Sequence, residues 1–175
     1  MTIRRLLPVL ALVLGLGALA PAEAQVSASG SVTGAIKVIQ PISLAVNKNL
    51  NFGTIVKGAG TVTVSNAGAL SAGGATAQVS SSAGSVSQGQ VTISGEGAQS
   101  ISVTVPASFS LTSGANTLTV TTTNDMTGSA SSQLLSGTLG STGTLTVNIG
   151  GSVPLTATTA SGSYSGSFTV SASYN

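Results

Sequence analysis

The chain has 175 residues, among them 23 Gly, 29 Ser and 23 Thr, but only five Lys and Arg and three Asp and Glu. It contains no His, Cys or Trp; without His and Cys, most general bases, thiol nucleophiles and soft metal ligands are missing, so we predict no catalytic residue, no metal site and no cofactor. A hydrophobic content of 41% with a formal net charge of +2 argues against a disordered chain, and so few cations argue against nucleic-acid binding.

The N-terminus has the three parts of an export signal. Arg4 and Arg5 precede an apolar run from Leu6 to Ala20, and the tripeptide at 22–24 places Ala on both sides of Glu23. A basic start, a short apolar run and such a small-residue site are typical of a secretory signal peptide. We therefore predict a signal peptide over residues 1–24. A membrane anchor is the less favoured alternative, because the apolar run is shorter than the ~20 residues that span a bilayer.

The next segment, residues 25–40, alternates with period two as far as Val38. Small or apolar residues occupy every second position: Val26, Ala28, Gly30, Val32, Gly34, Ile36 and Val38. The alternation breaks at residues 39–41, where Ile39 shifts the apolar parity and Pro41 cannot donate to a strand ladder. We predict an extended N-terminal arm, whose glycines would let it lie close to another backbone. The alternative is that this segment is the first strand of the chain's own sheet.

The body of the chain, residues 41–175, also alternates, but in short runs. Apolar residues alternate with Ser or Thr over Thr61–Ser65, Gln90–Ser94, Ser100–Val105, Thr117–Thr122 and Thr144–Ile149. Clusters that we interpret as turns separate them: Gly68–Gly74, Gly95–Gly97, Ser113–Asn116 and Gly150–Gly151. Short strands with turn signals at this spacing predict an all-β sandwich or barrel with one core.

The C-terminus predicts one long strand with a single buried face. From Gly162 to Asn175, every odd position up to Ser173 is Ser or Thr. The even positions are apolar, aromatic or Gly, namely Gly162, Tyr164, Gly166, Phe168, Val170, Ala172 and Tyr174. A period of two places these residues on one side of a strand.

The C-terminal spacing resembles the last strand of chaperone-usher pilin subunits, in which the penultimate residue is Tyr and the fourteenth from the end is Gly. Here these residues are Tyr174 and Gly162. The arm is similar to the alternating N-terminal extension of such pilins. The body resembles a bacterial family catalogued as domain of unknown function 4402, through the segments Pro41–Leu44, Leu50–Val56, Ile149–Gly151 and Gly162–Asn175.

The resemblance implies an immunoglobulin-like β-sandwich that lacks one strand. In pilins the open groove lies beside the last strand, here residues 162–174. A periplasmic chaperone fills it first, an outer-membrane usher exports the subunit, and the N-terminal arm of the next subunit then replaces the chaperone strand. By this resemblance the apolar arm positions are the donor strand, and the protein is a self-assembling, head-to-tail subunit of an extracellular fimbrium, with host or environmental surfaces as further candidate partners.

Two other classes of function stay open. A secreted adhesin or glycan-binding module would use exposed polar and aromatic residues; the candidates are Tyr164, Tyr174, Asn124 and Asp125. A glycoside hydrolase would need a pair of carboxylates, and Glu96 and Asp125 are the only ones after the predicted signal peptide. Both lie among turn-forming residues, so we expect them to be solvated turn residues and the protein not to be an enzyme.

Overall fold

The computed structural model describes residues 27–78 and 86–175. The predicted signal peptide and Val26 lie outside the described residues. The chain divides into two units, residues 1–36 and residues 37–175. In the first unit, residues 27–36 belong to no strand and all of them are exposed.

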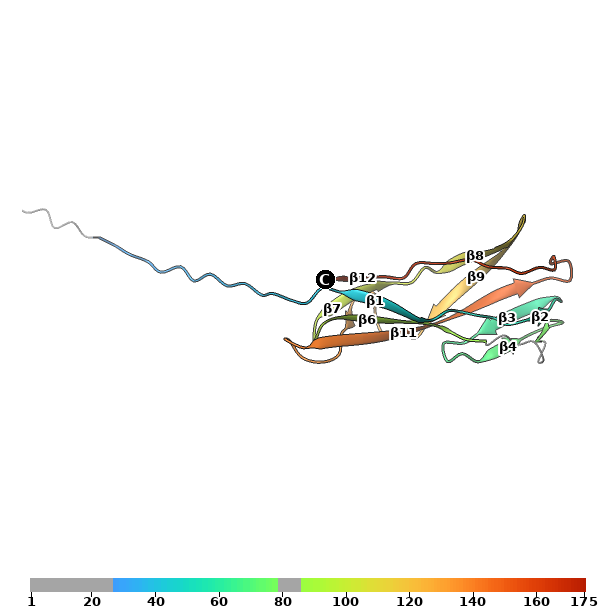
Figure 1. Cartoon of the computed structure of the whole chain (residues 1–175), viewed down its shortest axis with the longest axis horizontal. Helices are drawn as coiled ribbons and strands as arrows, with labels where there is room; N and C mark the ends of the chain where they lie inside the picture. Colours follow the sequence, from blue (N-terminus) through green and yellow to red (C-terminus); the bar gives the residue numbers. More distant parts are fainter. Residues whose placement is uncertain (1–26, 79–85) are drawn as a thin grey trace, which may run out of the picture. The chain divides into compact units, whose positions relative to one another are not determined.

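The second unit is all-β, as predicted, and its described residues include no helix (Figure 1). Its strands are β1 (Ser43–Lys48), β2 (Ile55–Val56), β3 (Gly60–Val64), β4 (Leu70–Ala72), β5 (Ala77–Gln78), β6 (Gly89–Glu96), β7 (Ser100–Thr104), β8 (Ser108–Ser113), β9 (Asn116–Asn124), β10 (Gln133–Leu134), β11 (Thr142–Leu155) and β12 (Ser171–Tyr174). The five alternating runs coincide with β3, β6, β7, β9 and β11. Among the described residues, no helix is long and apolar enough to cross a membrane.

All strand pairs are antiparallel, and the long strand β11 organises the larger sheet. Ile149 pairs with both β6 and β9, so these two strands lie on opposite edges of β11. Gly151 pairs with both β3 and β9. Strands β6 and β3 therefore follow each other along one edge of β11, while β9 pairs with the other edge. Strand β1 extends the sheet beyond β6, β4 extends it beyond β3, and β8 extends it beyond β9.

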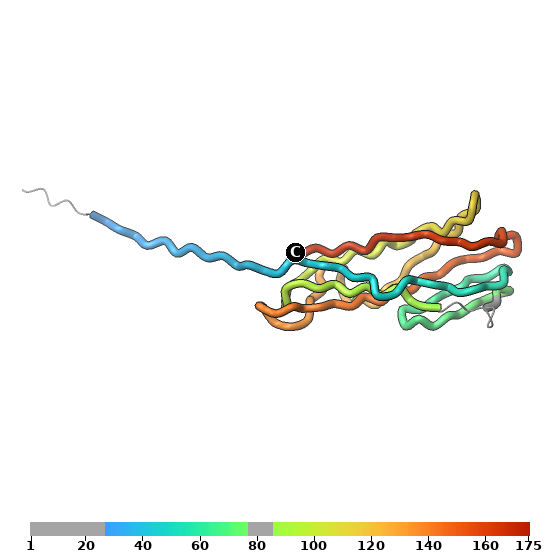
Figure 2. The backbone as a smooth tube through the Cα atoms, in the orientation of Figure 1, coloured from blue at the N-terminus to red at the C-terminus, as the bar shows by residue number. Residues whose placement is uncertain are grey.

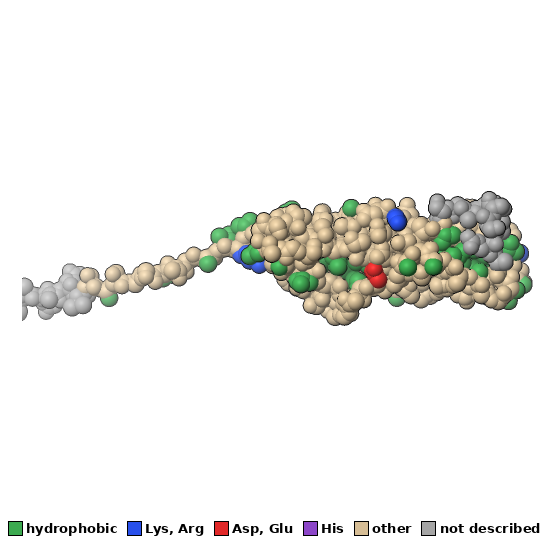
Figure 3. Space-filling model, turned by 90° about the horizontal axis from the view of Figure 1, so that it is seen from below, with side chains coloured by type: hydrophobic (Ala, Val, Ile, Leu, Met, Phe, Trp, Pro, Cys, Tyr) green, Lys and Arg blue, Asp and Glu red, His purple; other side chains and the backbone are tan. Residues whose placement is uncertain are grey.

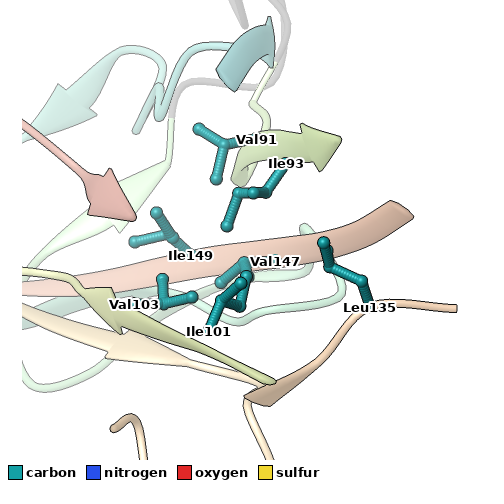
Figure 4. Close-up of a cluster of buried hydrophobic side chains, with 7 residues drawn as sticks. All are labelled: Val91, Ile93, Ile101, Val103, Leu135, Val147 and Ile149. Carbon is teal, nitrogen blue, oxygen red and sulfur yellow. The ribbon is translucent and has the colours of Figure 1, made fainter. Parts of the chain in front are cut away.

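A second sheet has the order β10-β7-β12 and packs against the first across an apolar core. The apolar side chains of the core come from every second position of a strand. In β6, Val91 and Ile93 are buried, whereas Thr92 and Ser94 are only half-buried. The inward side chains of both sheets meet in one cluster of Val91, Ile93, Ile101, Val103, Leu135, Val147 and Ile149 (Figure 4). A third, two-stranded sheet consists of β2 and β5.

One predicted turn is wrong, because Gly150 and Gly151 lie inside β11. The cluster Gly68–Gly74 contains two turns, with Gly68 at φ = 79° and Gly74 at φ = 72°, and the short strand β4 between them. A Cβ on Gly150 would lie 2.5 Å from the carbonyl oxygen of Val64, and one on Gly151 would lie 2.9 Å from Cγ1 of Val120. These glycines thus permit close packing inside a strand, where a sequence pattern suggests a break. The predicted turn at Ser113–Asn116 is confirmed, with Gly114 at φ = 58° between β8 and β9.

Candidate functional site

An open groove separates β1 from the C-terminal segment. It has a volume of about 1300 Å³, and its walls include Leu44 and Val46 on one side and Phe168 and Val170 on the other. Val91 and Ile149 of the core lie in its floor. A smaller hollow of about 230 Å³ lies between residues 42–44 and residues 170–172, so the opening continues along both walls. The tube in Figure 2 shows the two walls, in cyan and red, running along the same side of the body.

Both walls of the groove offer unpaired backbone. Strand β1 pairs with β6 on one edge only, and β12 pairs with β7 on one edge only. Within the described ranges, no strand pairs with the second edge of β1 or with the second edge of β12. Residues 166–170 line the groove yet belong to no strand. Such edges hold free N–H and C=O groups that an added strand can pair with.

The C-terminal segment keeps the predicted alternation but is not one continuous strand. From residue 168 to residue 175, even positions are half-buried and odd positions are exposed. The strand itself covers only Ser171–Tyr174, and before it a single bridge joins Ser165 to Thr112. Packing holds the rest in place: Phe168 lies on Phe109 with ring centroids 4.6 Å apart.

Both predicted glycines of this segment lie close to β8. A Cβ on Gly162 would lie 2.5 Å from Oγ of Ser113. A Cβ on Gly166 would overlap the carbonyl oxygen of Ser110 in β8. The segment therefore lies directly on the β8 backbone without forming a ladder with it. Gly162 and Gly166 are both exposed, whereas the other five predicted positions of the segment are half-buried.

The hydroxyl of Tyr174 links the C-terminal segment to the residues that precede β1. It donates a hydrogen bond to the carbonyl oxygen of Gln40 (2.9 Å) and accepts one from the amide of Glu96 (2.6 Å). Gly95 makes room for this hydroxyl, since a Cβ there would overlap it. The last strand is thus tied to the residue that precedes β1.

Glu96 corrects one of the predictions. It is only 3% exposed and ends β6 rather than lying in a solvated turn. Its carboxylate accepts hydrogen bonds from the amides of Gln40 (3.1 Å) and Gly140. The flanking glycines suggest a turn in the sequence, but here they allow close contact with Tyr174 and the 138–141 loop. We name the hydrogen-bonded group Gln40, Glu96 and Tyr174 the latch.

The described donor positions of the arm belong to no strand. Ala28, Gly30, Val32, Gly34, Ile36 and Val38 are all exposed. The exposed fractions of Val32 and Ile36 are 97% and 88%. Large apolar side chains in this state are available to a partner.

Each of the remaining candidates takes part in a hydrogen bond within the body. The Tyr164 hydroxyl donates to the carbonyl oxygen of Ala160 (2.9 Å), and the Asp125 carboxylate accepts two hydrogen bonds from Asn148 (2.8 and 2.7 Å). Asn124 accepts a local hydrogen bond from the amide of Met126. Within the described ranges, no three His, Cys, Asp or Glu residues cluster as metal ligands would.

The groove wall formed by β1 was not among the predicted site residues. Ile42, Leu44 and Val46 alternate with polar or small residues, and this pattern was sufficient to predict a strand. The wall also includes Leu50 and Phe52 after β1. Their contribution depends on how the chain folds back, which no local pattern shows.

Comparison with known proteins identifies a family. The model of the family described as "Domain of unknown function (DUF4402)" matches residues 42–174. Searches of the curated proteins and of the solved structures found no match. The match begins just before β1 and ends with Tyr174, so it includes both walls of the groove. On this match, which extends over most of its length, the chain belongs to the DUF4402 family.

Proposed function

We propose that this protein is a structural subunit of an extracellular, pilus-like filament, in which the N-terminal arm of one subunit fills the groove of the next. The observation that carries the proposal is the groove itself, whose two walls both have unpaired backbone. A strand added between β1 and the C-terminal segment would hydrogen-bond to both walls, and its alternate side chains would enter the groove. In this proposal the body is an immunoglobulin-like sandwich that lacks one strand.

The arm has the length and the pattern that such a strand needs. Residues 26–38 are as many as residues 162–174 of the wall, and a strand of this length extends about 43 Å at roughly 3.3 Å per residue. Four of its inward positions are large aliphatic residues, Val26, Val32, Ile36 and Val38. Full burial of each contributes about 1.5–3 kcal/mol, so the arm would contribute about 6–12 kcal/mol before the cost of ordering it.

The latch favours insertion into a neighbouring subunit rather than into the same one. Gln40 is held through its amide by Glu96, through its carbonyl by Tyr174 and through its side chain by Thr142. An arm folding back beside its own β1 would need a tight reversal at residues 39–41, which would break these hydrogen bonds. Pairing in trans keeps them, and head-to-tail pairing that does not close on itself produces a filament.

An empty groove is a hazard before assembly, because an apolar cleft with free strand edges promotes aggregation. A periplasmic chaperone that lends a strand, and an outer-membrane usher that exchanges it, would protect the subunit on its way to the cell surface. Repeated polar surfaces along the filament would then be available for adhesion to host or environmental surfaces.

The proposal is tested by changing the arm on one face only. Val32→Asp with Ile36→Asp places charges at inward positions, whereas Ser31→Asp with Thr33→Asp places the same charges at outward positions. We expect the first pair to abolish filaments seen by electron microscopy and the heat-sensitive oligomer ladder on SDS gels, because burying an unpaired carboxylate is costly. The second pair should assemble. Filaments of normal length from a chain lacking residues 25–36 would contradict the donor role.

A further inference from the structure

Three apolar side chains are exposed where the arm joins the body. The exposed fractions are 81% for Val38, 37% for Ile39 and 58% for Leu139. Ile39 precedes Gln40 and Leu139 precedes Gly140, and the amides of these two residues donate to the same Glu96 carboxylate. Ile39 and Leu139 therefore flank one fixed group. We name Val38, Ile39 and Leu139 the root cluster. Figure 3 shows hydrophobic side chains gathered at this end of the body.

A second apolar edge lies at the other end of the groove. Ile55 and Val56 of β2 line the groove, as do residues 159–162 opposite them, and Val56 is 51% exposed. Figure 1 shows β2 and the turn before residue 162 at one end of the body, with the start of β1 and the end of β12 at the other. We name Ile55, Val56 and Ala160 the β2 rim.

The two ends of the groove are not equally available to an incoming arm. At the β12 end, the latch already holds the root of the subunit's own arm through Gln40 and Tyr174. A neighbour whose arm root arrived there would meet this root and its latch. At the β2 rim, no described residue of the arm root is bound. The arm should therefore enter with its root at the β2 rim.

We propose that the root cluster of one subunit packs against the β2 rim of the next, at the point where the inserted arm leaves the groove and where Val38 is its last inward residue. The partner is a second copy of this chain, and the inference rests on the proposed function above. The two surfaces suit each other because both are apolar and partly exposed, and each lies at one end of the donor-strand path. The contact fixes the direction of insertion, with the arm running parallel to β1 and antiparallel to the C-terminal segment.

Pairs of engineered cysteines test this contact cleanly, because the chain has no Cys of its own. The variant Val38→Cys with Val56→Cys places thiols on the two surfaces proposed to meet. The control Val38→Cys with Leu44→Cys places the second thiol near the latch end of the same groove. Filaments would be treated with a short thiol crosslinker and boiled in SDS. We expect a covalent ladder from the first variant and none from the control, or from either single variant.

A charge at the root cluster provides a second readout. Leu139→Lys should slow assembly several-fold, because it would place an ammonium group against the β2 rim. Leu134→Lys is the matched control, since Leu134 is 65% exposed but belongs to β10 and not to the root cluster. Thermal unfolding of the monomers should be alike for both variants, which separates an assembly defect from a folding defect.

The outcomes distinguish this inference from the proposed function. A ladder from the control pair in place of the first pair would show that the arm inserts the other way round. Filaments without a ladder from either pair, assembling equally well with Leu139→Lys, would overturn the contact and leave donor-strand assembly standing. If the wild-type chain formed no filaments or SDS-resistant oligomers, the proposed function would fail, and the contact with it.

Discussion

Tyr174 joins three parts of the molecule through one hydroxyl group. It connects β12 to the amide of Glu96 at the end of β6 and to the carbonyl of Gln40 before β1. The start of β1 and the end of β12 are thereby linked at the same end of the body. Tyr174 thus has a structural role within the folded chain.

We predict that Tyr174→Phe destabilises the monomer by about 1–3 kcal/mol, because it leaves the Gln40 carbonyl and the Glu96 amide without their partner. Tyr164→Phe is the control: its hydroxyl makes one hydrogen bond, to Ala160, so its loss should cost about 0.5–1.5 kcal/mol. Urea unfolding followed by circular dichroism measures both values. Equal losses for the two variants would show that the latch adds no stability.

Strand β11 is the element on which the larger sheet depends, and Gly151 lies where its partners change. A Cβ at this position would lie 2.9 Å from Cγ1 of Val120, 3.1 Å from Cδ2 of Leu50 and 3.3 Å from Cζ of Phe52. Val120 is fully buried and cannot move aside, whereas Leu50 and Phe52 line the groove. An added methyl group would therefore disturb both the core and the groove.

We expect Gly151→Ala to cost about 1–3 kcal/mol by overpacking. The control is Gly73→Ala, where the nearest neighbour of an added Cβ is the Thr61 carbonyl oxygen at an ordinary 3.7 Å. There the substitution should be neutral or stabilise by about 0.4–1 kcal/mol, because Ala restricts the unfolded chain more than Gly does. Thermal unfolding distinguishes the two cases by the sign of the change in melting temperature. A loss of similar size in both would point to a general intolerance of Ala.

The elements also show how far the sequence could predict the structure. Alternation in Gln90–Ser94 and Thr144–Ile149 predicted strands β6 and β11, because burial of one face requires a period of two. Alternation does not show which strands pair with each other. The three partners of β11 and the unpaired edge of β1 could therefore not be predicted from the sequence. Glu96 and Gly151 were misread for a related reason: their neighbours in space come from distant parts of the sequence.

At the scale of the whole molecule, the scarcity of charge fits repeated assembly. Residues 25–36 of the arm carry no charged side chain. After the predicted signal peptide the charged residues are Lys37, Lys48, Lys57, Glu96 and Asp125. Of these, Glu96 is buried and Lys37 is hydrogen-bonded to Gln99. Identical copies stacked head to tail would therefore repel one another little.

This leads to a prediction about the conditions for assembly. If apolar burial and backbone hydrogen bonds hold the subunits together, filament stability should not fall as salt is raised from about 0.01 M to about 1 M, although the Debye length then shrinks from ~30 Å to ~3 Å. Sulfate should stabilise the filaments further, because excluded salts strengthen apolar burial. The temperature at which the SDS-resistant ladder dissociates measures this. A steep fall with sodium chloride would mean that ion pairs hold the subunits together, and the groove would then not be the main contact.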